Sequence, residues 1–342
     1  MKRLLLLLLL AFAICPTLAQ TPTTLTLWTP QSYQIFQRGH NGIRIVGEVR
    51  PAGSYSLEAS FAGAPYTLLA SGITRAFDVW LPASSGQGPL LVRLIETGQV
   101  VQRDYVGVGD VFVVAGQSNA VGYGLRYQAA YHPTYKAAVF GNNYQWKALA
   151  DPVDSATGQV DIISSDSSAL GSVWPLVATY IMADQNIPVA FVPAAKGGSS
   201  ILQWLPTDIY NRRTLFGSML NRIEAVEGVK AVLWWQGETD AYNKMSDWVY
   251  SDHLMAIAAK LHERTGTYLV TTLLGDITYA PAEATWNINA GILAAMEESP
   301  VILPGPDLSD IRSDDTAHFR TDEKLRLAAE RWWLALKTLF YS

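Results

Sequence analysis

Four short polar segments carry the residues of this sequence that are best suited to catalysis. They are Gly116–Asn119, Lys196–Ser200, Gln236–Asp240 and Asp314–His318. The first three follow apolar runs that predict buried strands, and the fourth lies between the last predicted strand and the last predicted helix. In open α/β sheets, ligands bind outside the carboxyl ends of the strands. The positions therefore predict a site at that end of a sheet.

Ser118 is the candidate nucleophile. A Ser hydroxyl at a strand-to-helix turn is exposed, and the N-terminus of the following helix favours developing negative charge. Ser is also a common helix N-cap, so the residue alone leaves both roles open. The neighbouring Gly116 and Asn119 favour the catalytic role.

A Ser nucleophile needs a general base, and the sequence contains His40, His132, His253, His262 and His318. His318 alone has a carboxylate three residues before it, on a predicted loop at the carboxyl end of the sheet. Asp315 at this spacing can accept from one ring nitrogen while the other faces Ser118. The alternative is that Asp315 caps the last helix and His318 is a surface residue.

The tetrahedral intermediate of acyl transfer also needs donors for its oxyanion. Gly197 and Gly198 permit a backbone N–H close to a substrate, and Gln236 offers a side-chain amide. The alternatives are a tight turn for the glycines and a helix cap for Gln236. Glu238 and Asp240 are candidates for orienting the Gln236 amide.

The sequence before Val111 has the alternating pattern of apolar and polar residues that is typical of β-strands. Short alternating runs at about ten-residue spacing are separated by Gly, Pro and Ser, which is typical of a small β-sandwich. The predicted strands are Thr24–Trp28, Gly42–Val49, Tyr55–Phe61, Phe77–Leu81, Leu90–Glu96 and Val100–Val106.

From Val111 onward, strands alternate with helices, which predicts a parallel α/β sheet with right-handed crossovers. The predicted strands are Val111–Ala115, Pro188–Ala195, Val229–Trp235, Tyr268–Leu274 and Val301–Leu303. The predicted helices are Val173–Asn186, Leu215–Glu227, Asp247–Thr265, Ala282–Glu298 and Asp322–Phe340. Between them, Arg126–Gly171 is predicted to be a long irregular segment of the kind that often binds ligands.

The N-terminus and the composition bound the class of protein. A basic start, an unbroken apolar run from Leu4 to Cys15 and small residues before Gln20 are typical of a secretory signal peptide. We therefore expect residues 1–19 to be cleaved, residues 20–109 to form the β domain, and residues 110–342 to form the α/β domain. The product would be exported, periplasmic or secreted, without a membrane span.

Cleavage changes the charge and the thiol chemistry of the chain. It leaves 23 basic residues against 30 acidic ones, so the net charge moves from −5 to −7. This balance argues against nucleic acid as a partner. The mature chain would hold no Cys, and therefore neither a disulfide nor a thiol nucleophile. No motif implies a metal or another cofactor, and the oligomeric state is left open.

The polar segments carry a family resemblance. Asp110–Asn119 resembles the first block of the SGNH hydrolases, and more narrowly the branch of sialate O-acetylesterases and acetylxylan esterases. Pro193–Trp204 is similar to the second block of that branch. Trp234–Asp240 is similar to its third block, in which Gln stands where other SGNH enzymes have Asn. Asp315–Phe319 resembles the fifth block.

The resemblance implies a three-layer α/β/α, flavodoxin-like fold and metal-free hydrolysis of acetyl esters on carbohydrate. Ser118 would be the nucleophile, His318 the base and Asp315 its partner. The N–H groups of Ser118 and Gly197, with the Gln236 amide, would form the oxyanion hole. The residues that support them would be Asn119, Gly198 and Glu238.

The chain departs from the family pattern at two points. Ala120 stands where this branch usually has Met, and no Gly follows His318 at the usual short distance. Neither change removes a reacting group, so both concern substrate preference. O-acetylated sialic acid, xylan and pectin fragments all remain candidates.

Two rival functions are open to test. The first is a carbohydrate-binding protein without catalysis, which the 11 Trp would suit. The Trp residues that are candidates to face a sugar are Trp146, Trp174, Trp204 and Trp286. The second rival is a peptidase or lipase of the α/β-hydrolase type, but its Gly-X-Ser-X-Gly elbow is absent because Ser118 is followed by Asn119 and Ala120.

Overall fold

The computed structural model describes residues 22–161 and 168–342. The predicted signal peptide, residues 1–19, lies outside the described residues, as does part of the predicted irregular segment. Within the described ranges, no helix combines the length and the apolar character that a membrane span requires.

The N-terminal half is built from strands. A three-stranded antiparallel sheet contains β1 (Thr24–Thr29), β3 (Ile43–Arg50) and β6 (Ala76–Leu81) in the order β1-β3-β6. A second set of strands pairs β5 (Thr67–Ile73), β4 (Tyr55–Phe61), β7 (Gly86–Leu94) and β8 (Val100–Gly116) in antiparallel fashion. The short β2 (Ile35–Gln37) adds to β8 in parallel. Alternating burial along β3 and β4 gives this half an apolar core of its own.

Strand β8 runs through both halves of the chain. Its first part pairs with β7, and Gly107–Gly109 pairs with β2. From Asp110 the same strand becomes part of the larger sheet and is buried on both faces. Two strands were predicted here, Val100–Val106 and Val111–Ala115, and they are one continuous element. The predicted domain boundary after Gly109 falls inside it.

The larger sheet has the order β10-β9-β11-β8-β12-β13-β14. Strands β11 (Val189–Pro193), β12 (Ala231–Trp235), β13 (Tyr268–Leu273) and β14 (Ile302–Asp307) are parallel to β8. Numbered along the chain from β8, these five strands follow the order 2-1-3-4-5. This order reverses between β8 and β12, which is where doubly wound sheets bind ligands.

Two short strands extend the sheet on the β11 side. They are β9 (Ala138–Phe140), parallel to β11, and β10 (Trp146–Ala148), antiparallel to β9. Both lie in the segment predicted to be irregular.

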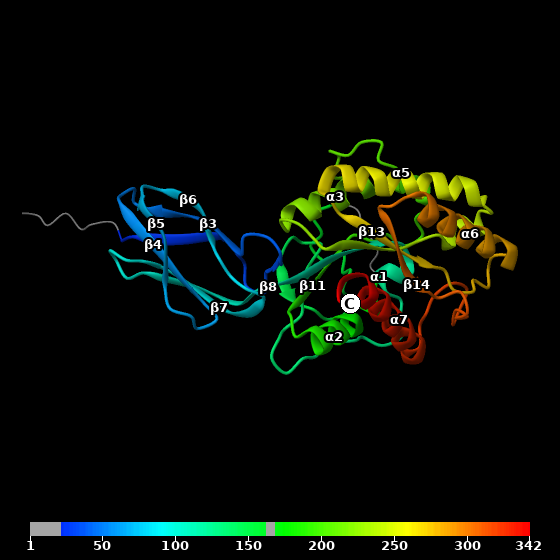
Figure 1. Ribbon diagram of the computed structural model, residues 1–342, viewed down its shortest axis with the longest axis horizontal. Coiled ribbons are helices and arrows are strands. Elements are labelled where there is room, and N and C mark those ends of the chain that lie inside the picture. The colour runs from blue at the N-terminus through cyan, green and yellow to red at the C-terminus, as the bar shows by residue number, and fades with distance from the viewer. Residues whose placement is uncertain (1–21, 162–167) are drawn as a thin grey trace, which may run out of the picture.

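The helices form two groups beside the sheet. Helices α2 (Trp174–Gln185) and α7 (Asp322–Phe340) pack together, and α5 (Asp247–Thr265) packs against α6 (Ala282–Glu298). In Figure 1, α3 (Leu215–Ala225) and α5 run above the strands, while α2 and α7 run below them. The shorter helices α1 (Ser118–Val121), η1 (Ile201–Trp204) and α4 (Glu238–Tyr242) begin close after strands β8, β11 and β12.

Candidate active site

The end of β8 presents Ser118 at the start of α1. Gly116 has φ +126° and lies against β12, where a Cβ would come within 2.0 Å of the Trp235 carbonyl oxygen. Only glycine fits this conformation and this approach. Gln117 is the N-cap of α1, and its side chain makes no capping bond. Ser118 is thus the first residue of the helix rather than its cap. Its N–H has no intrahelical acceptor, and it makes no hydrogen bond within residues 22–161 and 168–342.

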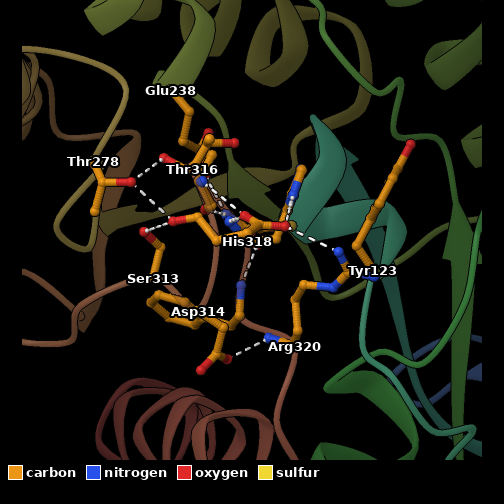
Figure 2. Close-up of polar contacts among 12 residues, drawn as sticks. Tyr123, Glu238, Thr278, Ser313, Asp314, Thr316, His318 and Arg320 are labelled. Carbon is orange, nitrogen blue, oxygen red and sulfur yellow. Dashed lines mark hydrogen bonds and ion pairs between the residues drawn. The ribbon is translucent and has the colours of Figure 1, made fainter.

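The loop before α7 holds Asp315 and His318 together. Asp315 Oδ2 lies 3.1 Å from His318 Nδ1, and its Oδ1 accepts from the backbone N–H groups of Ala317 and His318 at 2.9 and 2.8 Å. Burial raises the pKa of Asp315, but these donors outweigh it and hold the pKa well below its ordinary value. Asp315 is therefore ionised and orients the imidazole of His318; Figure 2 shows His318 between Tyr123 and Thr316.

The neighbouring Asp314 holds the two residues that precede α7. Asp314 Oδ2 accepts from the N–H groups of Arg320 and Thr321 at 2.7 and 2.8 Å, and Thr321 is the N-cap of α7. Lys324 Nζ lies 2.8 Å from Asp314 Oδ1. Asp315 does not cap the helix and instead contacts His318 and Arg320.

Ser118 and His318 line one open pocket of about 470 Å³. The other lining residues are Gln117, Tyr123, Gly198, Thr239, Tyr279, Thr316 and Ala317. Tyr123 stacks on the His318 ring, with centroids 4.6 Å apart. In the described part of the chain, no hydrogen bond joins Ser118 Oγ to His318. Such bonds are often long before substrate binds, so the shared pocket is the relevant observation.

Asn119 ties α1 to the His318 loop. Its Nδ2 donates to the Ala317 carbonyl at 3.0 Å and to Glu238 Oε1 at 2.7 Å, and its Oδ1 accepts from Phe319 N–H at 3.2 Å. Glu238 is fully buried, and this burial raises its pKa to about 7, although the Asn119 bond opposes the shift. Asn119 therefore holds the loop that carries His318 against the start of α1, where Ser118 lies.

Gln236 lies beneath the pocket rather than in its lining. Its side-chain Nε2 is within hydrogen-bond distance of Gln117 Oε1, the Ser199 carbonyl and Asp240 Oδ2, at 3.1, 3.0 and 2.6 Å. Its Oε1 accepts from Tyr250 OH at 3.0 Å. Asp240 is thus the carboxylate that contacts Gln236, while Glu238 contacts Asn119.

Gln117 is a site residue that sequence reasoning missed. Its Oε1 accepts from the Gln236 amide and from the N–H of Thr239 at 3.2 Å, and its Nε2 donates to Thr239 Oγ1 at 3.2 Å. Its place beside Ser118 in the first motif was the available signal. The side chain connects the ends of β8 and β12.

The turn after β11 brings Gly198 to the pocket. Gly198 has φ +69° and is exposed, and it lines the pocket, whereas Gly197 is not among the lining residues. Asp240 of α4 stabilises this turn, because it accepts from the Ser200 hydroxyl and from Ile201 N–H at 2.9 Å.

The four Trp candidates separate clearly by exposure. Trp174 and Trp204 have no exposed surface, and Trp146 is buried as well. Their contacts are with Phe191, Trp234 and Phe140. Trp286 is 68% exposed, so it alone of the four can meet a ligand.

The site is suited to nucleophilic acyl transfer. It combines a hydroxyl at the start of α1, an imidazole oriented by an ionised carboxylate, and the backbone N–H groups of Ser118 and Gly198 beside the pocket. Residues 22–161 and 168–342 hold no group of three His, Cys, Asp or Glu side chains placed to bind a metal.

Known structures share this fold. A carbohydrate acetylesterase from Xanthomonas citri matches with a TM-score of 0.58 and 18% identity, over 93% of this chain and 76% of that one. A protein from Arabidopsis thaliana matches with a TM-score of 0.53 and 18% identity, over 68% of this chain and 99% of that one. At this identity the likeness concerns the fold. No curated protein sequence gives a significant match.

The mixed α/β fold with its large sheet is similar to that of solved carbohydrate esterases. The family model described as carbohydrate esterase, sialic acid-specific acetylesterase, matches residues 108–332. The chain belongs to this family. It is a carboxylic ester hydrolase of the carbohydrate acetylesterase kind, which favours hydrolysis over the non-catalytic rival.

Proposed function

We propose that the chain removes O-acetyl groups from carbohydrate by way of an acetyl-enzyme on Ser118. The observation that carries the proposal is that Ser118 opens into the same pocket as His318, whose other ring nitrogen faces the ionised Asp315. This arrangement supports the roles of nucleophile for Ser118, base for His318 and orienting group for Asp315.

The steps follow from the roles of these groups. The His318 ring takes the Ser118 hydroxyl proton as Oγ attacks the acetyl carbonyl carbon. The tetrahedral intermediate collapses, and the sugar oxygen leaves with that proton. Water, deprotonated by the same ring, then attacks the acetyl carbonyl, and acetate and free Ser118 are released.

Backbone N–H groups are the donors best placed to stabilise the oxyanion. We infer that the Ser118 N–H provides one and that the Gly197–Gly198 turn provides the second. Gly198 is favoured in that turn because it lines the pocket. Gln236 has three acceptors around its amide nitrogen, so it is better suited to holding Gln117 and the turn than to direct donation.

We infer a three-layer α/β/α domain of the SGNH type behind an N-terminal β-sandwich, supported by the strand order and by the two helix groups. Export through a cleaved signal peptide is supported by the sequence of residues 1–19. The substrate is an acetylated sialic acid or a plant-type glycan.

The test is acetate release from acetylated glycans and hydrolysis of p-nitrophenyl acetate. We expect Ser118→Ala to lower kcat by about 10⁴-fold or more, because the nucleophile is lost while the pocket remains. His318→Ala should be comparably damaging, and Asp315→Asn should retain more activity. Ser71→Ala, an exposed Ser in the N-terminal half, is the matched control. Activity of Ser118→Ala equal to that of the control would reject the assignment.

A further inference from the structure

A second open pocket lies beside the Ser118 pocket and takes no part in the chemistry described above. Its volume is about 370 Å³, and we call it the Trp286 pocket. Its lining residues are Leu274, Asp276, Ala282, Thr285, Trp286, Asn289, Ser309, Asp310 and Arg312.

The lining has the chemistry of a sugar site. Trp286 offers a large apolar face, which matches the C–H face of a pyranose ring. Asp276 and Arg312 are exposed, and neither side chain makes a hydrogen bond or an ion pair within residues 22–161 and 168–342. One aromatic platform with a few unengaged polar groups is the usual composition of a small-ligand site.

The floor and the rim of the Trp286 pocket are fixed. Asn289 closes two hydrogen bonds with the Leu274 backbone, accepting from its N–H at 2.8 Å and donating to its carbonyl at 3.0 Å. At the rim, Arg331 binds both carboxylate oxygens of Asp310. The pocket is therefore formed before any ligand arrives, which lowers the entropic cost of binding.

The two pockets are separated by one wall made of two chain segments. Asp276 N–H donates to the Ile311 carbonyl at 3.0 Å, and Thr278 N–H donates to the Thr316 carbonyl at 3.0 Å. Figure 2 shows Thr278 beside the loop that carries Thr316 and His318. The same segments line both pockets, with Asp276 on one side and Tyr279 on the other. Asp276 and Tyr279 are three residues apart, a span of at most about 10 Å, so an oligosaccharide of a few units is long enough to cross the wall.

We propose that the Trp286 pocket is a second sugar subsite, which binds a pyranose unit of the same chain whose acetylated unit enters the Ser118 pocket. The inference rests on the proposed function for the identity of its ligand. It makes the enzyme a deacetylase of oligosaccharides or polysaccharides rather than of free acetyl sugars.

The test measures binding apart from catalysis. Acetylated xylo-oligosaccharides of two to six units are titrated by calorimetry into Ser118→Ala, which cannot turn them over. The same titration uses Ser118→Ala combined with Trp286→Ala. We expect the second variant to bind the longer oligosaccharides about tenfold more weakly or worse, because the truncated residue is an aromatic anchor. Its affinity for the shortest acetylated sugar should stay unchanged.

Trp248→Ala in the Ser118→Ala background is the matched control. Trp248 is 67% exposed, close to the 68% of Trp286, and lines neither pocket. Equal affinity of the Trp286 and Trp248 variants would overturn the subsite, as would absence of oligosaccharide binding to Ser118→Ala. The wild-type assay on p-nitrophenyl acetate decides the proposed function separately, because that ester is too small to reach Trp286.

Discussion

At the scale of single residues, Arg320 shares the carboxylate that orients the base. Its Nη1 lies 3.1 Å from Asp315 Oδ2, the same oxygen that faces His318 Nδ1. Arg320 is only partly exposed, so its charge is screened less than that of a fully solvated side chain. Arg320 therefore holds Asp315 in place beside His318.

This arrangement predicts that Arg320→Met lowers kcat by about threefold to thirtyfold, because Asp315 loses one of the groups that hold it against His318. Steady-state kinetics on p-nitrophenyl acetate measure the effect. Arg126→Met, which removes a far more exposed Arg, is the control. A kcat of Arg320→Met equal to that of the control would contradict the role.

The sequence allowed the contact between Asp315 and His318 to be predicted, but not the support that Gln117 gives. Ser118, Asp315 and His318 stand in short motifs whose spacing already implies a turn or a local bond. The support from Gln117 depends on Gln236, which is 119 positions away, and such a pairing exists only after the sheet has formed.

At the scale of elements, Glu238 joins the start of α4 to α1, and Asn119 carries this connection on to the His318 loop. Its Oε1 accepts from Asn119, and its Oε2 is buried without a hydrogen-bond partner in the described part of the chain. Burial is the main reason that its pKa rises from 4.5 to about 7. A group with a raised acid pKa binds its proton more tightly in the folded state. Stability therefore falls as pH rises from about 4.5 to 7, and the loss is complete above pH 7.

Glu238→Gln should flatten this dependence, because the amide keeps the shape and an acceptor for Asn119 but carries no proton equilibrium. The unfolding free energy of the wild type should drop between pH 5 and 8 by roughly 3 kcal/mol more than that of the variant. Urea unfolding at the two pH values measures the difference. Glu283→Gln, an exposed carboxylate on α6, should behave as the wild type. If the free energy of unfolding of the wild type and of Glu238→Gln changed equally with pH, a raised pKa of Glu238 in the folded state would be contradicted.

The elements themselves were predictable where the apolar pattern was long. Helices α5, α6 and α7 have the predicted bounds, as does strand β4. Strand β5 was missed because its exposed residues do not alternate with buried ones. Strands β9 and β10 were missed because three residues are too few to carry a period.

At the scale of the whole molecule, Asp110 joins the N-terminal half to the sheet that carries the site. It lies in β8 with no exposed surface. From the N-terminal half it accepts from Gln37 and Arg38, at 3.2 and 2.7 Å. From the C-terminal half, Tyr341 OH donates to it at 2.6 Å, and Lys230 Nζ lies 3.4 Å away. Burial lowers the pKa of Lys230, but Asp110 opposes the shift.

Asp110→Asn should therefore destabilise the whole chain rather than one half. The amide leaves the cations of Arg38 and Lys230 without a counter-charge, and removing one partner from a buried ion pair typically costs about 3–5 kcal/mol. Strand β8 pairs with strands of both halves. We therefore expect the backbone amides of β4 and of β12 to lose their protection from hydrogen exchange at the same denaturant concentration. Hydrogen exchange read by mass spectrometry at increasing urea measures this directly.

The matched control for that experiment is Asp104→Asn, an exposed Asp on the same strand, whose effect should stay within about 0.5 kcal/mol. If Asp110→Asn lowers protection in β4 alone, the halves unfold separately and the continuous strand does not couple them. If both strands lose protection together, the β domain contributes to the stability of the sheet that holds Ser118. Its truncation would then lower the activity of the esterase through folding, with no contact to the substrate required.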